Sequence, residues 1–580
     1  MQSTPLGAQY RLTALQQLAE EEFDVLVVGG GIVGAGAALD AISRGLSVAL
    51  VEARDWAAGT SSRSSKLIHG GLRYLEQRDF ALVREALKER SILLDWIAPH
   101  LVRPVPFLLP LRHRVWERAY IGAGVLLYDT MGSAGGTRAL PRHRHLTKSA
   151  ALRQAPGLRS EAFVGAIQYY DAQVDDARYV MMLARTAAQY GATVATRTRV
   201  TGFARQAGRV TGALVRDLES GREYTVRAKR VISAAGVWTD DVHELANARG
   251  NVRVRAAKGV HLVVPRDRIN LHTGLIARTE KSVLFVIPWG RHWLIGTTDT
   301  DWHLDRDHPA ATKADIDYLL EHVNAVLSDP ISRDDIEGVY AGLRPLLSAG
   351  EGRETSQLSR EHVVDSPVPG LVIVTGGKFT TYRVMAKDAV DAAVADFAQP
   401  VPDSASDRVQ ILGADGFAVL WNERRRIAQR CGLHPSRVEH LLHRYGSCVD
   451  ELLELIAADP SLRAPIAGAP DYLRVEAVYA ASHEGALHLD DVLARRTRIS
   501  IEARDRGAAA APDVAALIAP ILGWDARTER AEVEGYLARM RAERDRQERP
   551  DDAAGAEIVR GAPDPGQADS RSLPDAPVSG

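Results

Sequence analysis

The stretch from residue 24 to residue 34 constrains this chain more than any other. It reads Asp-Val-Leu-Val-Val-Gly-Gly-Gly-Ile-Val-Gly, a buried-type strand that leads through a GxGxxG sequence into an Ala-rich helical stretch. In this pattern Gly29 permits a tight turn, Gly31 lets the backbone approach a pyrophosphate, and Gly34 lets the helix pack on the strand. The start of the helix offers free N–H groups to phosphates. The pattern predicts a dinucleotide site at the start of an α/β domain.

A second strand supports this interpretation. Residues 47–51, Ser-Val-Ala-Leu-Val, are mostly apolar and typical of a strand, and Glu52 follows them. An acid at this position, about twenty residues after the glycines, accepts hydrogen bonds from the ribose hydroxyls of an adenosine. The alternative is a glycine-rich turn without a ligand, and the complete strand–turn–helix–strand–acid context disfavours it.

Two later segments favour FAD over NAD. Residues 231–238 are a hydrophobic strand that ends in a turn of small residues, and residues 374–383 place two glycines before a helix. The second segment provides another helix start that can face an anionic or carbonyl group. Each segment alone is compatible with an ordinary turn. Together with the first, they indicate a ligand wrapped by a large domain.

The amino-acid composition and the predicted secondary structure change along the chain. Residues 1–22 read as a polar leader, and residues 23–400 alternate short strands with helical stretches. Residues 409–545 are rich in Leu, Ala, Glu and Arg, and residues 546–580 in Pro, Asp, Gly and Ala. We therefore expect an α/β, Rossmann-like FAD-binding domain interleaved with a β-sheet substrate domain, then an all-helical C-terminal domain and a disordered tail.

Composition excludes several classes of protein. Lys and Arg total 72 and Asp and Glu 74, so the formal net charge is −2 and no global basic field for nucleic acid exists. Two cysteines cannot build a disulfide scaffold or a zinc site alone, and we expect no metal. No apolar run reaches the ~18 residues of a membrane span. Residues 112–128 join basic, aromatic and apolar side chains, which fits either an interfacial segment or a buried helix with a basic flank.

Several motifs carry a resemblance to a known family. The most specific is residues 64–76, Ser-Ser-Lys-Leu-Ile-His-Gly-Gly-Leu-Arg-Tyr-Leu-Glu, and further motifs lie at residues 170–178, 258–261, 287–290, 296–299, 342–345 and 377–383. These residues resemble the flavoproteins typified by D-amino-acid oxidase and, among them, the FAD-dependent, aerobic glycerol-3-phosphate dehydrogenases. The resemblance covers residues 23–400 and reaches the C-terminal domain through residues 491–498.

The resemblance implies a particular reaction. It is the oxidation of sn-glycerol 3-phosphate to dihydroxyacetone phosphate, in glycerol and glycerophospholipid catabolism. FAD, held non-covalently, takes the hydride, and a membrane quinone takes the electrons. The protein is then cytoplasmic and peripheral on the inner face of the plasma membrane, without a nucleic-acid partner, and a homodimer is compatible with it. The alternatives are an oxidase of the same fold that produces hydrogen peroxide, and a catalytically dead flavin-binding module.

The chemistry requires a base, because the C2 hydroxyl must lose a proton as the hydride leaves. His261 is the candidate, since histidine titrates near neutrality. Strand alternation puts Gly259 on the same face, and we expect this glycine to leave space beside the imidazole. A packed, hydrogen-bonded core histidine is the alternative.

The substrate phosphate requires guanidinium groups, which bind phosphate bidentately. Arg344 and Arg360 flank a polar loop. If the flanking segments form a hairpin centred on Gly352, the two arginines face each other, and an anion between them relieves their repulsion. Arginines splayed to solvent are the alternative. Lys378 is predicted to place positive charge near the flavin N1–C2=O edge and so to stabilise the reduced anion.

With the resemblance included, the candidate residues fall into three groups. The predicted catalytic residues are His261, Lys378 and Arg344, and the predicted substrate-binding residues are Arg73, Tyr74, Arg344 and Arg360. The predicted cofactor-binding residues are Gly29, Gly31, Gly34, Glu52, Thr60, Ser61, Ser62, Ser65, Lys66, His69, Gly70, Gly71, Gly236, Trp238, Gly376, Gly377, Lys378, Thr380 and Thr381.

Overall fold

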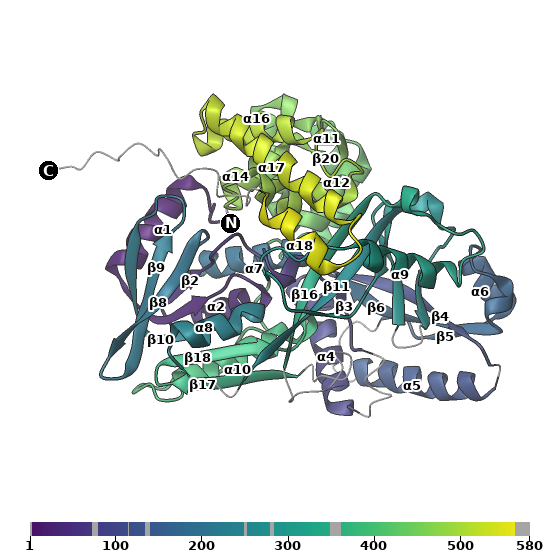
Figure 1. Ribbon diagram of the computed structural model, residues 1–580, viewed down its shortest axis with the longest axis horizontal. Helices are drawn as coiled ribbons and strands as arrows, with labels where there is room; N and C mark the ends of the chain where they lie inside the picture. Colours follow the sequence, from purple (N-terminus) through teal and green to yellow (C-terminus); the bar gives the residue numbers. More distant parts are fainter. Residues whose placement is uncertain are drawn as a thin grey trace.

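The structure is a computed structural model that describes residues 3–71, 79–113, 115–133, 140–248, 252–278, 283–347 and 361–562. Its strands form two large sheets, one on each side of the molecule in Figure 1, and the helices of the C-terminal domain lie above both. The chain enters the first sheet, crosses to the second and returns more than once, so the two sheets are interleaved in sequence.

The first sheet contains the glycine-rich motif. Its central strand β1 (Glu22–Val28) pairs in parallel with β2 (Val48–Val51) and β10 (Glu223–Ser233). The apolar run in β1 is fully buried because helices cover both faces of the sheet. Helices α2, α7 and α10 cover one face and α1 covers the other. Their bounds, with the remaining strands, are α1 (Ala8–Glu20), α2 (Ile32–Ser43), α7 (Asp176–Gln189), α10 (Tyr382–Val394), β7 (Thr193–Ala195), β8 (Thr198–Gln206), β9 (Arg209–Asp217), β17 (His362–Val368) and β18 (Leu371–Gly376).

The second sheet supplies the wall opposite the glycine-rich motif. Its long strand β11 (Val254–Pro265) pairs with β16 (Gly338–Leu347) in an unbroken antiparallel register. Helices α4 and α5 pack on one face of the sheet, and α6 and α9 pack on the other. The remaining elements are β3 (Leu67–Ile68), α4 (Phe80–Ile92), β4 (Arg103–Leu111), α5 (Trp116–Ser133), β5 (Arg144–Thr147), α6 (Lys148–Gln154), β6 (Gly165–Gln173), β12 (Gly274–Arg278), β13 (Val283–Trp289), β14 (His292–Gly296), β15 (Thr300–Trp302) and α9 (Lys313–Asn324).

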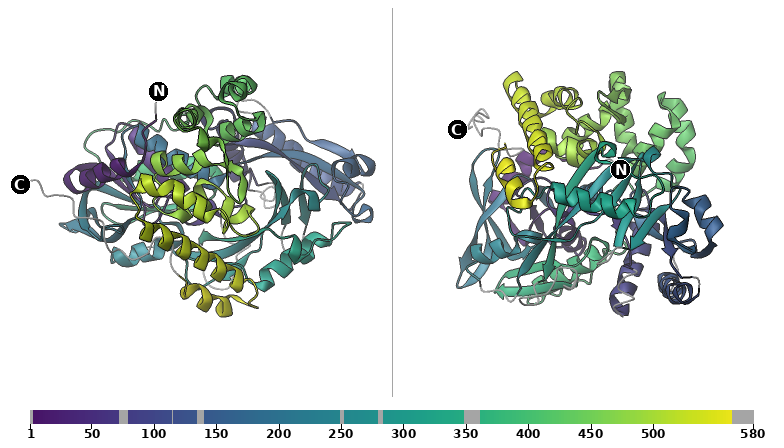
Figure 2. Two further views of the ribbon diagram at one scale, coloured as in Figure 1. Left: turned by 90° about the horizontal axis from the view of Figure 1, so that it is seen from above. Right: turned by 45° about the vertical axis from the view of Figure 1, so that its right-hand side comes forward.

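The C-terminal domain is helical with one exception. A short hairpin of β19 (Pro465–Ile466) and β20 (Ala469–Leu473) interrupts it, which corrects the all-helical expectation. The hairpin turns at Gly468, where φ is +74°, and this single tight turn is too short a pattern to stand out in a helical sequence. Figure 2 shows the domain lying across the centre of the molecule. Its main helices are α11 (Phe417–Cys431), α12 (Pro435–Tyr445), α13 (Val449–Ala458), α14 (Arg474–His483), α16 (Ala511–Leu522) and α17 (Ala526–Arg546).

Described residues near both ends of the chain form helices that composition did not predict. Helix α1 occupies most of the expected leader, and its Leu15 and Leu18 are buried against the first sheet. The tail expected from residue 546 includes a further helix, α18 (Asp552–Arg560), held where Asp552 accepts a hydrogen bond from Lys258 Nζ at 2.6 Å. The disordered-tail expectation is therefore wrong for this helix, and residues 563–580 lie outside the described ranges.

Candidate active site

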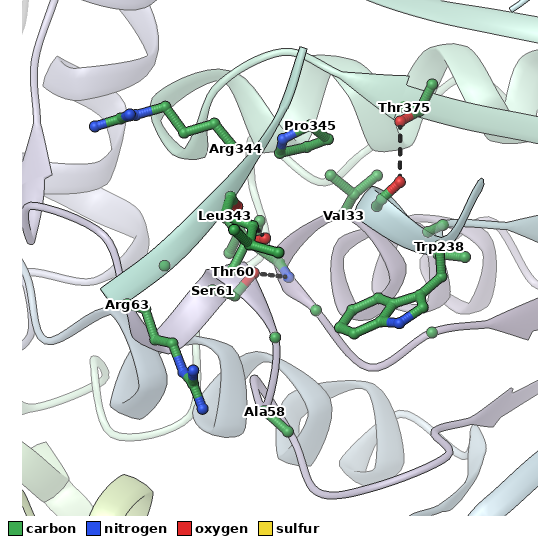
Figure 3. A pocket seen from close by; sticks show the side chains of 18 of the residues that line it. Val33, Ala58, Thr60, Ser61, Arg63, Trp238, Leu343, Arg344, Pro345 and Thr375 are labelled. Carbon is green, nitrogen blue, oxygen red and sulfur yellow. Dashed lines mark hydrogen bonds between the residues drawn. The ribbon is translucent and has the colours of Figure 1, made fainter. Parts of the chain in front are cut away.

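A cavity of about 590 Å³ lies between the two sheets. One wall is formed by the loops that follow β1, β2, β10 and β18, and the opposite wall by β11 and β16. Figure 3 shows part of the lining, with Arg344 on one side and Trp238 on the other. The carboxyl ends of parallel strands are where open α/β sheets bind their ligands.

The glycine-rich loop is shaped for a close approach of a ligand. Gly29 has φ +109°, and a Cβ there would lie 2.7 Å from the carbonyl oxygen of Ala234. A Cβ on Gly34 would lie 1.8 Å from the carbonyl oxygen of Gly29, so the helix packs here only without a side chain. Gly31 lines the cavity, and beside it Ser61 Oγ accepts a hydrogen bond from the N–H of Ile32 at 3.0 Å. These are the turn, packing and approach positions that a pyrophosphate requires.

Glu52 joins the glycine turn to the cavity. Its carboxylate accepts hydrogen bonds from the N–H of Gly30 at 2.6 Å and the N–H of Arg54 at 2.8 Å. Burial raises the pKa of Glu52. Each carboxylate oxygen can accept more than one hydrogen bond, so these contacts leave capacity for a ribose hydroxyl. The ribose contact itself stays a prediction.

His261 is buried in β11 and is held by two neighbours. Its ring stacks on Tyr340, with ring centroids 4.8 Å apart and planes 8° apart. Its Nε2 lies 2.8 Å from Ser65 Oγ, while Nδ1 has no hydrogen-bond partner within the described part of the chain. Burial, and then the positive charges of Arg344 and Lys66, hold the pKa of His261 well below its usual range. The imidazole is therefore neutral at neutral pH and can accept a proton.

Two glycines make room for side chains at this site, and the prediction that Gly259 leaves space beside the imidazole is wrong. Gly296, directly opposite His261 in the register of β14, is the residue beside the imidazole, because a Cβ there would lie 2.3 Å from His261 Cδ2. A Cβ on Gly259 would instead lie 2.5 Å from Arg344 Nη2. Strand alternation gives the face of a residue but not the neighbour that fills the space, so Gly259 makes room for the guanidinium.

Arg344 reaches the cavity from β16 and is held at its guanidinium. Nη2 donates to Thr297 Oγ1 at 2.9 Å, and Nη1 donates to the carbonyl oxygen of Thr298 at 3.2 Å. Nη1 also lies 3.3 Å from Asp299 Oδ1. These partners belong to residues 296–299, one of the motifs noted in the sequence. They fix the direction of the guanidinium beside His261.

The structure brings most of the predicted site residues to one cavity. The lining includes Gly29, Gly31, Glu52, Thr60, Ser61, Ser65, His69, Gly236, Trp238, His261, Arg344, Gly376, Gly377, Lys378 and Thr380. Six other predicted residues are not part of the lining, namely Gly34, Ser62, Lys66, Gly70, Gly71 and Thr381. Arg73, Tyr74 and Arg360 lie outside the described residues, as does the hairpin expected around Gly352.

Residues behind the lining support it. Lys66 Nζ is buried and pairs with Asp176 Oδ1 at 2.8 Å, below the loop that carries Ser65. Gly70 donates its N–H to Tyr128 Oη at 2.8 Å. The N–H of His69 donates to Thr380 Oγ1 at 3.1 Å, which ties two lining segments together. These contacts fix the loops from outside the cavity.

Sequence reasoning missed Tyr340, which stacks on the imidazole. Tyr340 stands directly opposite His261 in the antiparallel register of β11 and β16. Aromatic residues that face each other across two strands are neighbours. The register of these two strands is the signal that could have found it, but Tyr340 lies 79 positions after His261 in the sequence.

These features define a flavin-dependent oxidoreductase, and comparison with known proteins agrees. Residues 24–392 match the model of the FAD dependent oxidoreductase family, and residues 404–529 match the C-terminal domain of alpha-glycerophosphate oxidase. The chain is 57% identical to glycerol-3-phosphate dehydrogenase 2 of Mycobacterium tuberculosis, over 96% of this chain and 95% of the relative. It is 36% identical to the human mitochondrial glycerol-3-phosphate dehydrogenase, over 94% of this chain and 78% of the relative. The chain belongs to the family of FAD-dependent glycerol-3-phosphate dehydrogenases.

A solved structure supports both the fold and the cofactor. The glycerol-3-phosphate dehydrogenase of Bacillus halodurans, in complex with FAD, superposes with a TM-score of 0.77 at 28% identity, over 92% of this chain and 98% of that one. L-alpha-glycerophosphate oxidase from Mycoplasma pneumoniae shares the fold at 20% identity, with a TM-score of 0.52 over 66% of this chain and 97% of that one. The predictions of the fold class, the family and FAD are confirmed.

Proposed function

We propose that this protein oxidises sn-glycerol 3-phosphate to dihydroxyacetone phosphate and delivers the electrons from FAD to a respiratory quinone. The observation that carries the proposal is the pairing of a neutral, buried His261 with the cationic Arg344 in the cavity that the dinucleotide motif opens. A base and a phosphate-binding group side by side match an alcohol that carries a phosphate.

In this proposal the proton of the C2 hydroxyl passes to the imidazole of His261, whose Nδ1 is buried in the structure. This nitrogen has no hydrogen-bond partner within the described residues, whereas Nε2 is engaged by Ser65. If Nε2–H donates to Ser65 Oγ, the tautomer keeps its lone pair on Nδ1. Tyr340 stacks on the imidazole and fixes the plane of its ring. When bound, FAD supplies the hydride acceptor.

Arg344 binds the substrate phosphate in this proposal. Its guanidinium is oriented by Thr297 and carries a charge that a phosphate can pair with bidentately. Arg73, Tyr74 and Arg360 are proposed to complete the substrate site, as the family resemblance implies. Lys378 lines the same cavity at the start of the 3-10 helix η8 (Phe379–Thr381), and we assign it to the reduced flavin.

The proposed FAD contacts are the sequence-predicted residues that line the cavity. Gly29, Gly31 and Ser61 would hold the pyrophosphate at the start of α2. Glu52 would hold the ribose of the adenosine. The cavity is also lined by Ser65, His69 and Thr380, which would lie at the flavin end of the bound cofactor.

We propose α5 as the contact with the membrane surface on the cytoplasmic side. Across the ranges that the structure describes, none of the helices combines the length and apolar character needed to cross a bilayer. One face of α5 packs on the second sheet through Val125 and Tyr128. The other face exposes 60% of Trp116, 58% of Tyr120 and 55% of Leu126. Exposed aromatic and aliphatic side chains on the free face of a packed helix favour contact with a membrane interface.

An oxidase is the second candidate function. The C-terminal domain matches a model named for alpha-glycerophosphate oxidase. The two functions differ only in the acceptor, so the acceptor is the test. With glycerol 3-phosphate present, a dehydrogenase reduces a soluble quinone analogue and produces little hydrogen peroxide in air. Stoichiometric hydrogen peroxide without an added acceptor would make the protein an oxidase, and failure to turn over with either acceptor would make it a flavin-binding module.

A further inference from the structure

A second cavity of about 120 Å³ lies where three parts of the molecule meet. The FAD-binding domain contributes the loop after β2, the substrate sheet contributes β16, and the C-terminal domain contributes α17. Arg54, Ala58 and Arg63 line both this cavity and the larger one. In Figure 3 the guanidinium of Arg63 extends away from that of Arg344.

The lining of this second cavity is strongly basic. Among the described residues it holds seven arginines against three carboxylates, and neither the proposed reaction nor the FAD site accounts for the five arginines that line this cavity alone. The arginines are Arg54, Arg63, Arg197, Arg495, Arg498, Arg506 and Arg539, and the carboxylates are Asp55, Asp490 and Glu543.

Three of the arginines are neutralised by close ion pairs. Arg495 pairs with Asp55 at 2.5 Å and with Asp490 at 2.7 Å. Arg498 pairs with Asp175 at 2.5 Å, and Arg197 lies 3.6 Å from Asp491. These pairs join the C-terminal domain to the FAD-binding domain and use up two of the carboxylates in the lining.

Among the described residues the other four arginines have fewer close carboxylate partners, although Glu52 attracts Arg54. Arg506 and Arg539 lie 3.3 and 3.6 Å from Glu543. In the described structure, the guanidiniums of Arg54 and Arg63 donate to backbone carbonyl oxygens only, at 3.1 Å for Arg54 and at 3.3 and 3.4 Å for Arg63. A carbonyl oxygen satisfies an N–H group but does not neutralise its charge. The cavity therefore keeps an excess of positive charge.

Burial makes that excess unfavourable. Arg506 and Arg539 are only 4% and 3% exposed. Burial lowers the pKa of Arg63 to about 10 and also lowers the pKa of Arg506. A charge removed from water needs an opposite charge nearby, and here the described protein provides too few.

We propose that this cavity binds a small phosphate-bearing anion, such as inorganic phosphate, pyrophosphate or a short phosphoester. Guanidinium groups bind phosphate oxygens bidentately, and several converge here from the FAD-binding and C-terminal domains. The volume of about 120 Å³ exceeds the roughly 30 Å³ that one water occupies. Because the anion would contact side chains that also line the FAD cavity, its binding and FAD binding are coupled reciprocally.

The test is calorimetric titration of the FAD-loaded enzyme with pyrophosphate and, separately, with inorganic phosphate. Arg539→Gln should weaken binding of the tighter anion about ten- to a hundredfold, the effect of one charge-assisted hydrogen bond. Arg541→Gln is the matched control, because Arg541 lies on the same helix but is exposed, and it should leave the affinity unchanged. Arg344→Ala separates the two cavities, since it alters only the larger one and should retain anion binding.

A second variant tests whether removal of a negative charge from the cavity strengthens anion binding. Glu543→Gln removes the carboxylate shared by Arg506 and Arg539, so anion binding should tighten. Glu543 is 28% exposed at its side chain, and this variant tests the cavity even if Arg539→Gln fails to fold. Flavin content and melting temperature identify any variant that is misfolded. The proposal is overturned if neither anion binds the parent enzyme, if Arg344→Ala abolishes binding, or if Arg541→Gln weakens binding as much as Arg539→Gln.

Discussion

His261→Asn tests the role of the imidazole most sharply. Asparagine keeps some of the size and polarity of histidine but cannot accept the C2 hydroxyl proton. Loss of a general base costs about 10²–10⁴ in rate. At about 1.36 kcal/mol per factor of ten, the barrier rises by roughly 2.7–5.4 kcal/mol. The loss should appear in the rate of flavin reduction, because the proton transfer belongs to that step, and the flavin content should be retained.

The assay is stopped-flow flavin reduction across a range of pH. The parent rate should rise with pH, because the neutral imidazole is the active form. Burial and two nearby cations hold the pKa of His261 well below its usual range, so the step should lie below the pH of about 6.5 at which a free imidazole titrates. The step should be absent from His261→Asn. Ser65→Ala is the companion variant, and loss of one hydrogen bond predicts a decrease of about two- to thirteenfold.

Two outcomes would refute this reasoning. The first is a His261→Asn variant that reduces its flavin at the parental rate with the parental pH profile, which would make the histidine structural. The second is a slow variant that has also lost its flavin, which would place the defect in cofactor binding. If the first outcome is found, Lys378 and a bound water are the next candidates for the base.

Four further predictions follow from the same geometry. Gly31→Val should yield protein without bound flavin, measured by its visible spectrum, because the side chain would enter the cavity where the pyrophosphate is expected. Arg344→Ala should raise the KM for glycerol 3-phosphate about ten- to a hundredfold while FAD is retained, and an unchanged KM would exclude it from the phosphate site. Trp116→Ser combined with Leu126→Ser should abolish co-sedimentation with anionic vesicles, whereas Val419→Ser, which alters a side chain 62% exposed on α11, should not. His100 is buried, and burial lowers its pKa to about 3. Unfolding therefore takes up a proton below the unfolded pKa of about 6.5, and the free energy of unfolding should fall by about 1.4 kcal/mol between neutral pH and pH 5.5. Calorimetry should find this decrease reduced in His100→Gln.

The local motifs were readable because their chemistry lies in consecutive residues. The positions of Gly29 and Gly34 follow from the sequence of one turn, and the structure places them where the turn requires. The placement of Glu52 at the end of β2 is equally local. Residues in a βαβ unit are brought together by the unit itself, so the sequence alone predicts the nucleotide end of the site.

The catalytic end depends on contacts that sequence spacing does not encode. Gly296 and Tyr340 contact His261 because β14 and β16 both pair with β11, and that strand order is a tertiary property. The same limit explains why Gly259 was assigned to the wrong neighbour. The arginines of the second cavity come from three separate parts of the chain, and the motif at residues 491–498, which holds two of them, did not indicate that they would meet the others.

The prediction of a disordered tail was wrong at α18 for a different reason. Low hydrophobicity predicts disorder because few apolar groups can be buried. Helix α18 mixes alanines with polar residues, and its Asp552 is held by the buried Lys258. An ion pair between residues 294 positions apart cannot be read from local composition.

Anaerobic mixing of the purified protein with glycerol 3-phosphate is the most direct test of the central claim. The proposed activity predicts that the oxidised flavin bands bleach at a rate that supports turnover, that dihydroxyacetone phosphate appears in an amount equal to the flavin reduced, and that a soluble quinone analogue restores the bands. Glycerol should bleach the bands far more slowly, because it lacks the phosphate that Arg344 is proposed to bind. A flavin that stays oxidised with glycerol 3-phosphate, or that is reduced equally well by glycerol, would contradict the account.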